Sequence, residues 1–75
     1  MDDTSVTIEQ MEWFMLARLE RFARLAADPQ VQEAPAWHHL ARRATMATWS
    51  DCIALGLRTE ALTILRNARA SLYGL

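Results

Sequence analysis

The segment from Pro35 to Leu55 carries apolar residues on two opposite faces when it is drawn as a helix of about 3.6 residues per turn. One face holds Trp37, Leu40, Ala41, Ala44, Ala47 and Leu55. The other face holds Met46, Trp49 and Ile53. A helix that is apolar on both sides needs a neighbour on both sides. Because a 75-residue chain has few elements to spare, we expect a second copy or another protein to cover part of this helix.

The composition predicts one small all-α domain spanning residues 1–75. The chain has thirteen Ala, ten Leu, eight Arg, only two Gly and two Pro, and scattered β-branched residues. All eight basic residues other than histidine are arginines, which together with the many alanines indicates a GC-rich, bacterial-like genome rather than phosphate binding. A single cysteine, Cys52, excludes an internal disulfide, so helix packing and self-association remain as sources of stability.

Three helices are expected, over residues 8–27, 35–55 and 59–73. Thr7 and Gln10 form a capping-box pattern before the first helix. Asp28 and Pro29 begin a polar connection that could itself form one helical turn. Gly56 supplies a left-handed stop after the second helix, and Thr59 is expected to cap the third. Short connections favour antiparallel neighbours, hence a three-helix antiparallel bundle, or a helical hairpin with an added helix, that is oligomeric.

The apolar stripes of the outer two helices follow from spacings of three and four residues. In the first helix the stripe consists of Ile8, Met11, Met15, Leu19, Phe22 and Ala26, widened by Phe14, Leu16, Ala23 and Leu25. In the third helix the stripe consists of Ala61, Ile64, Leu65, Ala68 and Leu72, before Gly74 ends the helix.

Two charges interrupt these apolar faces. Arg18 falls among apolar residues of the first helix and Asp51 among those of the second. We expect each to be partly buried and to find an opposite charge or a hydrogen-bond partner, within the chain or across a dimer. With the midpoint of the connection near residue 31, a simple hairpin offsets the two by roughly 10 Å, which the extra length of the connection or a neighbouring subunit would have to make up. A buried pair would fix the register of the helices more than their stability.

No residue pattern predicts catalysis, a metal or a cofactor. His38 and His39 are adjacent, so on a helix they point about 100° apart and cannot share a metal ion. Neither has an acidic residue three or four positions away to orient it as a base. Cys52 is near a helix C-terminus and lacks a neighbouring base, so we interpret it as a small core residue. We therefore expect a protein that is not an enzyme.

Tryptophans outside the primary stripes point to an interface. Trp13 lies opposite the stripe of the first helix, and Trp49 lies on the second face of the middle helix. Tryptophan is enriched at interface hot spots. Trp13, Met46, Trp49 and Ile53 are therefore predicted to be interface residues. The predicted function is a protein–protein interaction module, such as an adaptor, regulatory subunit or inhibitor, that binds itself or a larger protein.

Two helix-pair patterns fit the segment around Gly56. Gly56 followed by Ala61 and Ala68 resembles the hairpin turn of a tetratricopeptide repeat, which implies protein binding. The chain departs from that pattern at Cys52, where the repeat has an aromatic residue, and at Trp49, where it has a small one.

The alternative function is a helix-turn-helix DNA-binding regulator that uses the helix pair of residues 51–67. Cys52, Leu55, Leu57, Leu62 and Leu65 match the pattern of small and apolar positions. Asp51 stands where that pattern is normally apolar, and the recognition helix would be poorly basic. The net charge of −1 also gives no attraction for phosphates, so nucleic acid is not expected as a partner.

Charge and hydropathy along the chain bear on its location. Residues 1–6 are acidic, are expected to be disordered, and lack the basic and apolar regions of a signal peptide. No apolar stretch approaches the length of a membrane span, so we expect a cytoplasmic protein that does not bind membranes. Residues 1–34 carry a net charge of −4 and residues 35–75 a net charge of +3, which suits antiparallel pairing or a charged partner.

Overall fold

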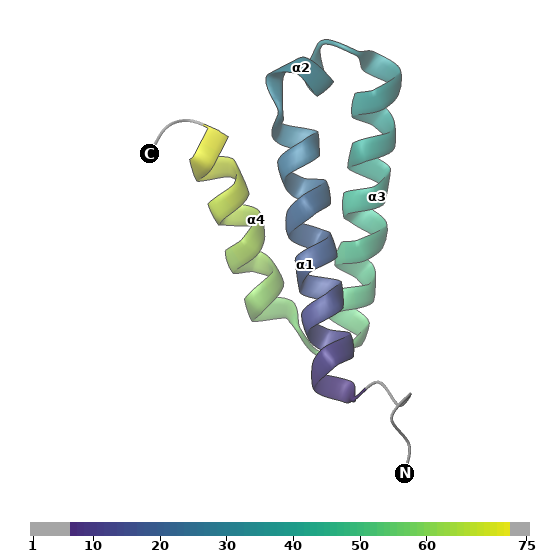
Figure 1. Cartoon of the computed structure of the whole chain (residues 1–75), viewed down its shortest axis with the longest axis vertical. Coiled ribbons are helices and arrows are strands. Elements are labelled where there is room, and N and C mark those ends of the chain that lie inside the picture. The colour runs from purple at the N-terminus through teal and green to yellow at the C-terminus, as the bar shows by residue number, and fades with distance from the viewer. Residues whose placement is uncertain (1–6, 73–75) are drawn as a thin grey trace.

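Four helices follow one another in the computed structural model of the chain, which describes residues 7–72, with side chains to residue 69 (Figure 1). They are α1 (Ile8–Ala27), α2 (Pro29–Gln32), α3 (Pro35–Ala54) and α4 (Arg58–Leu72). Since residues 7–72 contain no strand, the predicted all-α class is confirmed. The expectations for residues 1–6, for the Leu72 side chain and for Gly74 concern parts of the chain outside this description.

The start of α1 is the predicted capping box. The backbone N–H of Gln10 donates to Oγ1 of Thr7 at 3.1 Å, and the backbone N–H of Thr7 donates to Oε1 of Gln10 at 3.0 Å. Two N–H groups that the helix itself leaves without acceptors are thereby satisfied. The boundaries of α1 agree with the predicted range 8–27.

The connection after α1 contains the single helical turn α2. Oδ1 of Asp28 accepts a hydrogen bond from the backbone N–H of Gln30 at 2.8 Å, and Pro29 occupies the first helical position, where its missing N–H costs nothing. Of the two conformations that the sequence allowed here, the short helix is the one that forms.

Gly56 ends α3 in the predicted left-handed conformation, with φ of 78°. Its N–H donates to the carbonyl oxygen of Ile53 at 3.0 Å, and the N–H of Leu57 donates to that of Cys52 at 2.9 Å. These two bonds define a Schellman motif, which satisfies carbonyl groups at the end of the helix. Leu57 and Cys52 are also buried in one cluster, so the turn carries the usual apolar contact across the helix end.

The predicted cap of α4 is wrong. The helix begins at Arg58, and the N–H of Ala61 donates to the carbonyl oxygen of Leu57 at 2.9 Å, so Leu57 holds the N-cap position and Thr59 lies inside the first turn. The reason is tertiary: Leu57 is only 5% exposed, and burying this side chain fixes where the chain enters α4.

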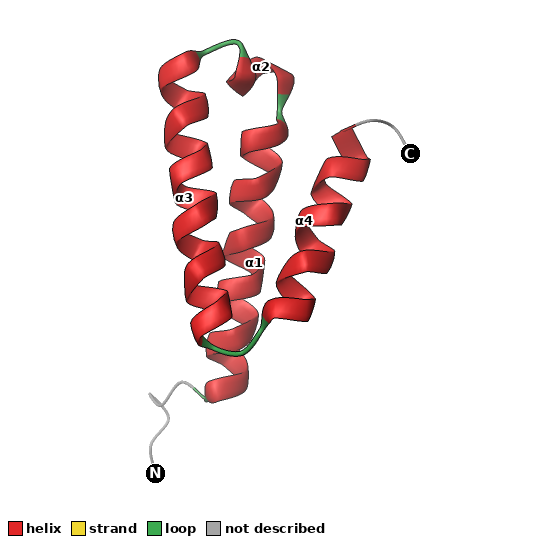
Figure 2. Cartoon of the chain, turned by 180° about the vertical axis from the view of Figure 1, so that it is seen from behind, coloured by secondary structure: helices red, strands yellow, loops and turns green. Residues whose placement is uncertain are grey.

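Helices α1 and α3 run antiparallel, and α4 packs mainly on α1 (Figure 1). Seen from behind, α4 diverges from α3 as it leaves the Gly56 turn (Figure 2). The core is a cluster of four buried residues with half-buried neighbours around it. The buried four are Leu19, Cys52, Leu57 and Ala61, and the neighbours are Met15, Leu16, Trp49, Ile64 and Leu65. As predicted, the described stripe residues Ala61, Ile64, Leu65 and Ala68 are buried or half-buried.

The residues of α3 that are most buried are small. Thr48 and Cys52 are its two buried residues; Ala41, Ala44 and Thr45 are half-buried, as are the larger His38 and Trp49. The two threonine hydroxyls donate to carbonyl oxygens four residues earlier in the helix, at 2.7 and 2.8 Å, so neither is left without a partner. Thr45, Thr48 and Cys52 lie between the two apolar faces seen in the sequence, and Ala41 and Ala44 lie at the near edge of the first face. Each face therefore flanks the contact between α3 and α1.

Sulfur Sγ of Cys52 lies 3.9 Å from the carbonyl oxygen of Met15 and gives the register of the α1–α3 pair. Arg18, three residues after Met15, is therefore level with Trp49, three residues before Cys52. Asp51 is two residues from that level, which is about 3 Å along the helix axis. The offset of roughly 10 Å that a simple hairpin would give is largely made up by the connection, because the residues of α2 move its midpoint beyond residue 31.

Candidate interaction surface

One side of the α1–α3 pair has no helix over it within residues 7–72. Helix α4 lies on the other side of α1 (Figure 1). Between α1 and α3, near the α2 turn, the uncovered side is hollowed by about 440 Å³. The hollow is lined entirely by apolar residues, namely Phe22, Leu25, Val31, Trp37, Leu40, Ala41 and Ala44. It therefore offers an apolar contact surface without a charged group in its lining.

The same side continues along both helices at spacings of three and four residues. We call it the outer face and define it by two sets of residues. From α1 it takes Met11, Phe14, Arg18, Phe22 and Leu25; from α3 and its cap it takes Trp37, Leu40, Ala44, Ala47, Asp51 and Leu55, with Val31 of α2 at one end.

Large apolar side chains on the outer face are exposed to solvent. Six of them are more than one-third exposed: Met11, Phe14, Leu25, Trp37, Leu40 and Leu55. Trp37 alone is 68% exposed. Monomeric proteins rarely expose contiguous apolar patches of more than a few hundred Å², and larger patches mark interaction sites. The outer face is therefore the strongest candidate for a binding surface in the described chain.

The four predicted interface residues do not form one surface. Trp49 is half-buried and packs against the core of its own chain. Met46 and Ile53 are exposed on the side of α3 away from the outer face, and Trp13 is 66% exposed with its ring 5.6 Å from that of Phe14. Their role in binding stays a prediction.

The outer face could have been found from the sequence by a different choice of the contacting residues on α3. The sequence places the predicted interface on the face of this helix with Trp49 and Ile53, and not on the face with Trp37 and Leu40. The most buried positions carry small side chains such as Thr48 and Cys52, which hydrophobicity alone ranks low. Their recurrence at intervals of three and four residues marks the side of α3 that contacts α1.

Arg18 and Asp51 both lie on the outer face and are both exposed. The expectation that each is partly buried is therefore wrong for a single chain. No ion pair joins them, and among the described residues the only ion pair is between Glu20 and Arg24, at 3.2 Å. Each charge was assigned to the right apolar stripe, but the stripe is open to solvent, so no burial follows.

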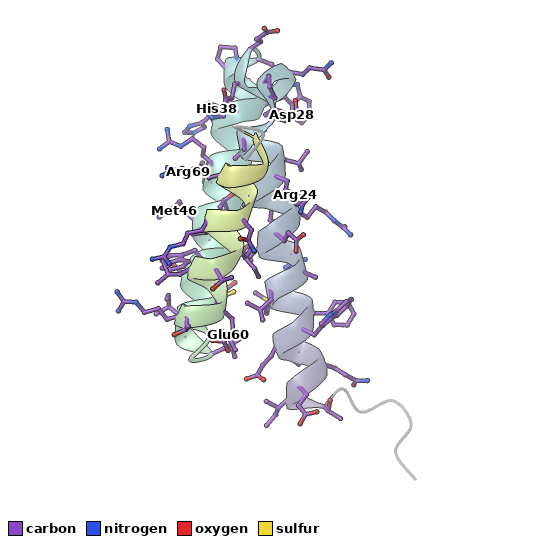
Figure 3. All side chains as sticks on the ribbon, turned by 90° about the vertical axis from the view of Figure 1, so that its left-hand side faces the viewer. Arg24, Asp28, His38, Met46, Glu60 and Arg69 are labelled. Carbon is purple, nitrogen blue, oxygen red and sulfur yellow. The ribbon has the colours of Figure 1, made fainter. Side chains whose placement is uncertain are left out.

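A second groove, of about 540 Å³, lies between α3 and α4. Its lining includes Ala23, Ala26 and Ala27 of α1, apolar residues of α3 and α4, and the basic side chains of His38, Arg42, Arg66 and Arg69. Figure 3 shows His38 and Met46 on the α3 edge and Arg69 on α4, with Arg24 on the opposite edge of the molecule. Among the residues with described side chains, none that lines this groove is acidic, which gives it a positive character.

Cys52 is buried, and its surroundings disfavour the charged thiolate. Removal from water, and to a smaller extent the negative charge of Asp51, raises the pKa of this thiol. The thiol is fully enclosed, in contact with the Met15 carbonyl oxygen, as expected for a small core residue.

Metal ligands do not cluster in residues 7–69: no three His, Cys, Asp or Glu side chains lie where they could share an ion. The described helices include none with the length and apolarity needed to span a membrane. No protein-family model matches the sequence, and no curated protein or solved structure matches it either.

Proposed function

We propose that the chain is a non-catalytic protein–protein interaction module, of the adaptor, regulatory-subunit or inhibitor kind, that works by burying its outer face on another protein surface. The observation that carries this proposal is the uncovered apolar side of the α1–α3 pair, including the hollow between Phe22, Leu25 and Leu40. A non-catalytic role is supported by the burial of Cys52, the single thiol of the chain, inside the core, where a substrate does not reach it. We place the protein in the cytoplasm, where a reduced, unpaired cysteine persists.

Site-specific photo-crosslinking in living cells tests the proposal. A photoreactive amino acid replaces Leu40 on the outer face, and in a matched control it replaces Asn67, an exposed polar residue of α4. Under the proposal, light produces a covalent adduct with a protein from position 40 and little from position 67. Equal adduct from both positions, or none from position 40, contradicts it.

DNA binding is the second candidate because of the groove between α3 and α4. Four basic side chains, His38, Arg42, Arg66 and Arg69, line it without an acidic one, and Gly56 makes a tight turn between the two helices. DNA binding of this kind weakens steeply with salt, because each phosphate contact releases a counterion.

Fluorescence anisotropy with duplex DNA at rising salt decides between the two candidates. If the interaction module is correct, no salt-sensitive binding occurs at micromolar protein. Binding that is lost in Arg66→Gln but kept in Arg21→Gln, a matched exposed arginine of α1, would favour the DNA-binding reading instead.

A further inference from the structure

We infer that the occupant of the outer face is a second copy of this chain, packed face to face about a two-fold axis parallel to α1 and α3. This inference rests on the proposed function and names the partner of the same surface. In this dimer α1 of each copy lies on α3 of the other, and both α4 helices remain on the outside, since α4 packs on the opposite side of α1.

The outer face reaches the lower size limit of a specific dimer interface. A 20-residue helix such as α1 or α3 is about 30 Å long. Two helices packed side by side, with axes about 9 Å apart, present a face roughly 18 Å wide. Two such faces cover on the order of 1,000 Å² in total, which reaches the size of a specific interface.

The shapes of the two halves of the outer face are complementary. The α1 half carries large side chains, including Phe14, Phe22 and Leu25, whereas the middle of the α3 half carries Ala44 and Ala47. Under the register given by Met15 and Cys52, Phe22 is level with position 45, which lies between those two alanines. A two-fold axis parallel to the helices preserves this level, so it places Phe22 of one copy against the small side chains of the other.

The two charges of the outer face are also complementary. A two-fold axis parallel to the helices keeps Arg18 at the level of position 49. Arg18 of one copy is therefore about 3 Å from Asp51 of the other copy, measured along the helix axis. The symmetry produces this contact twice. Neither charge has an ion-pair partner among residues 7–69 of its own chain, and each gains one at the centre of the interface.

An axis perpendicular to the helices gives a poorer interface. It would stack α1 on α1 and α3 on α3. Arg18 is at the middle of the outer face of α1, which runs from Met11 to Leu25, so a central perpendicular axis would bring Arg18 against Arg18 and Asp51 against Asp51. Like charges facing each other are unfavourable, and polar residues at such central positions select register and orientation.

Charge reversal tests the contact between the copies. Sedimentation equilibrium gives the dimer dissociation constant of the wild type and of three variants. Arg18→Asp and Asp51→Arg should each weaken the dimer at least tenfold, and the double variant should return to within about threefold of the wild type. Glu20→Arg combined with Arg24→Glu, which reverses the exposed ion pair away from the outer face, is the control and should leave the constant unchanged. Circular dichroism checks that each variant keeps its helix content.

Disulfide trapping tests the axis. With Phe22→Cys and Ala47→Cys in one chain, mild oxidation should give a covalent dimer, while chains with only one of the two changes should stay uncrosslinked. The native Cys52 does not interfere because it is buried. A covalent dimer from Arg18→Cys alone, the position that a central perpendicular axis brings against itself, would indicate that axis and overturn the inference.

Other outcomes separate this inference from the proposed function. A chain that is monomeric at millimolar concentration but forms adducts with a different protein from position 40 overturns the dimer and keeps the interaction module. A dimer that resists Arg18→Asp but is weakened by Trp49→Gln with Ile53→Gln uses the other face of α3, and this also overturns the inference. If neither a dimer nor an adduct forms, both proposals fail.

Discussion

The two sides of the α1–α3 pair are built from the same kind of apolar repeat but differ in cover. On one side, Leu57 and Ala61 close over Leu19 and Cys52, and all four are at most 5% exposed. On the outer face, large side chains remain in water. The difference shows that an apolar stripe indicates which residues need cover but not which chain supplies it. This chain has one long helix beyond the pair, so it covers one side.

The Gly56 turn determines which side α4 covers. The left-handed residue reverses the chain within three residues, and Leu57 enters the core directly after it. Together they commit α4 to α1 and away from the outer face. The uncovered side is therefore a consequence of turn chemistry as much as of hydrophobicity.

The largest expected effect is a truncation on the covered side. Leu19→Ala removes a fully buried side chain and should lower the free energy of unfolding by about 2–5 kcal/mol. A domain of this size has a total stability of roughly 4–11 kcal/mol, so urea unfolding should show a clearly lower midpoint.

Leu40→Ala on the outer face is the matched change. Leu40 is 51% exposed in the single chain. At protein concentrations where the chain is monomeric, Leu40→Ala should therefore lower the free energy of unfolding by less than about 1 kcal/mol. If Leu19→Ala and Leu40→Ala lowered the free energy of unfolding of the monomer equally, the two sides of the α1–α3 pair would not differ in how well they are covered.

The helices were largely predictable because their signals are local. The Thr7–Gln10 capping box, the Pro residues at helix starts and Gly56 each act through bonds within a few residues, and α1 agrees with its predicted range. The start of α4 was not predictable from such signals. Thr59 is a good local cap, but burial of Leu57 decides the boundary, and burial depends on a contact with a distant part of the chain.

The candidate surface was predictable only in part, for a related reason. The sequence indicates that α3 is apolar on both sides and needs a further partner. It does not show that Trp49 packs into its own core while Trp37 stays outside, because the small residues at the seam determine how α3 is rotated toward α1.

The turn that places α4 on one side gives the next largest effect. A Cβ built on Gly56 meets nothing within 4 Å, so a substitution there is opposed by the left-handed backbone and not by a clash. Gly56→Ala should lower the free energy of unfolding, measured in urea, by about 1–2 kcal/mol, and Gly56→Val should lower it by more. Gly56→Asn should cost less than either, because Asn tolerates this conformation. Equal losses for all three would point to a cause other than backbone strain.

Helix α1 contributes residues to both sides of the α1–α3 pair, and its N-terminal cap can be removed by one substitution. Thr7→Ala removes the hydroxyl that accepts from the Gln10 N–H and should lower the free energy of unfolding by about 1 kcal/mol. Thr59→Ala is the matched control. Since Thr59 is inside the first turn of α4 and not at its cap, this change should alter the free energy of unfolding by less than about 0.5 kcal/mol. If Thr59→Ala lowered the free energy of unfolding as much as Thr7→Ala, Thr59 would be the cap of α4, as predicted from the sequence.

The smallest effect compares charges on the two sides of α1. Glu20 and Arg24 form an exposed pair four residues apart, so Glu20→Gln should lower the free energy of unfolding by at most about 0.5 kcal/mol, and less in high salt. This loss should not depend on protein concentration, because the pair lies away from the outer face. Arg18→Gln should be close to neutral in dilute solution, where Arg18 has no partner, and should become destabilising as concentration rises and a second copy supplies Asp51. Thermal melts of both variants at two concentrations a hundredfold apart measure this, and a concentration dependence that is equal for Glu20→Gln and Arg18→Gln would remove the distinction between the two sides.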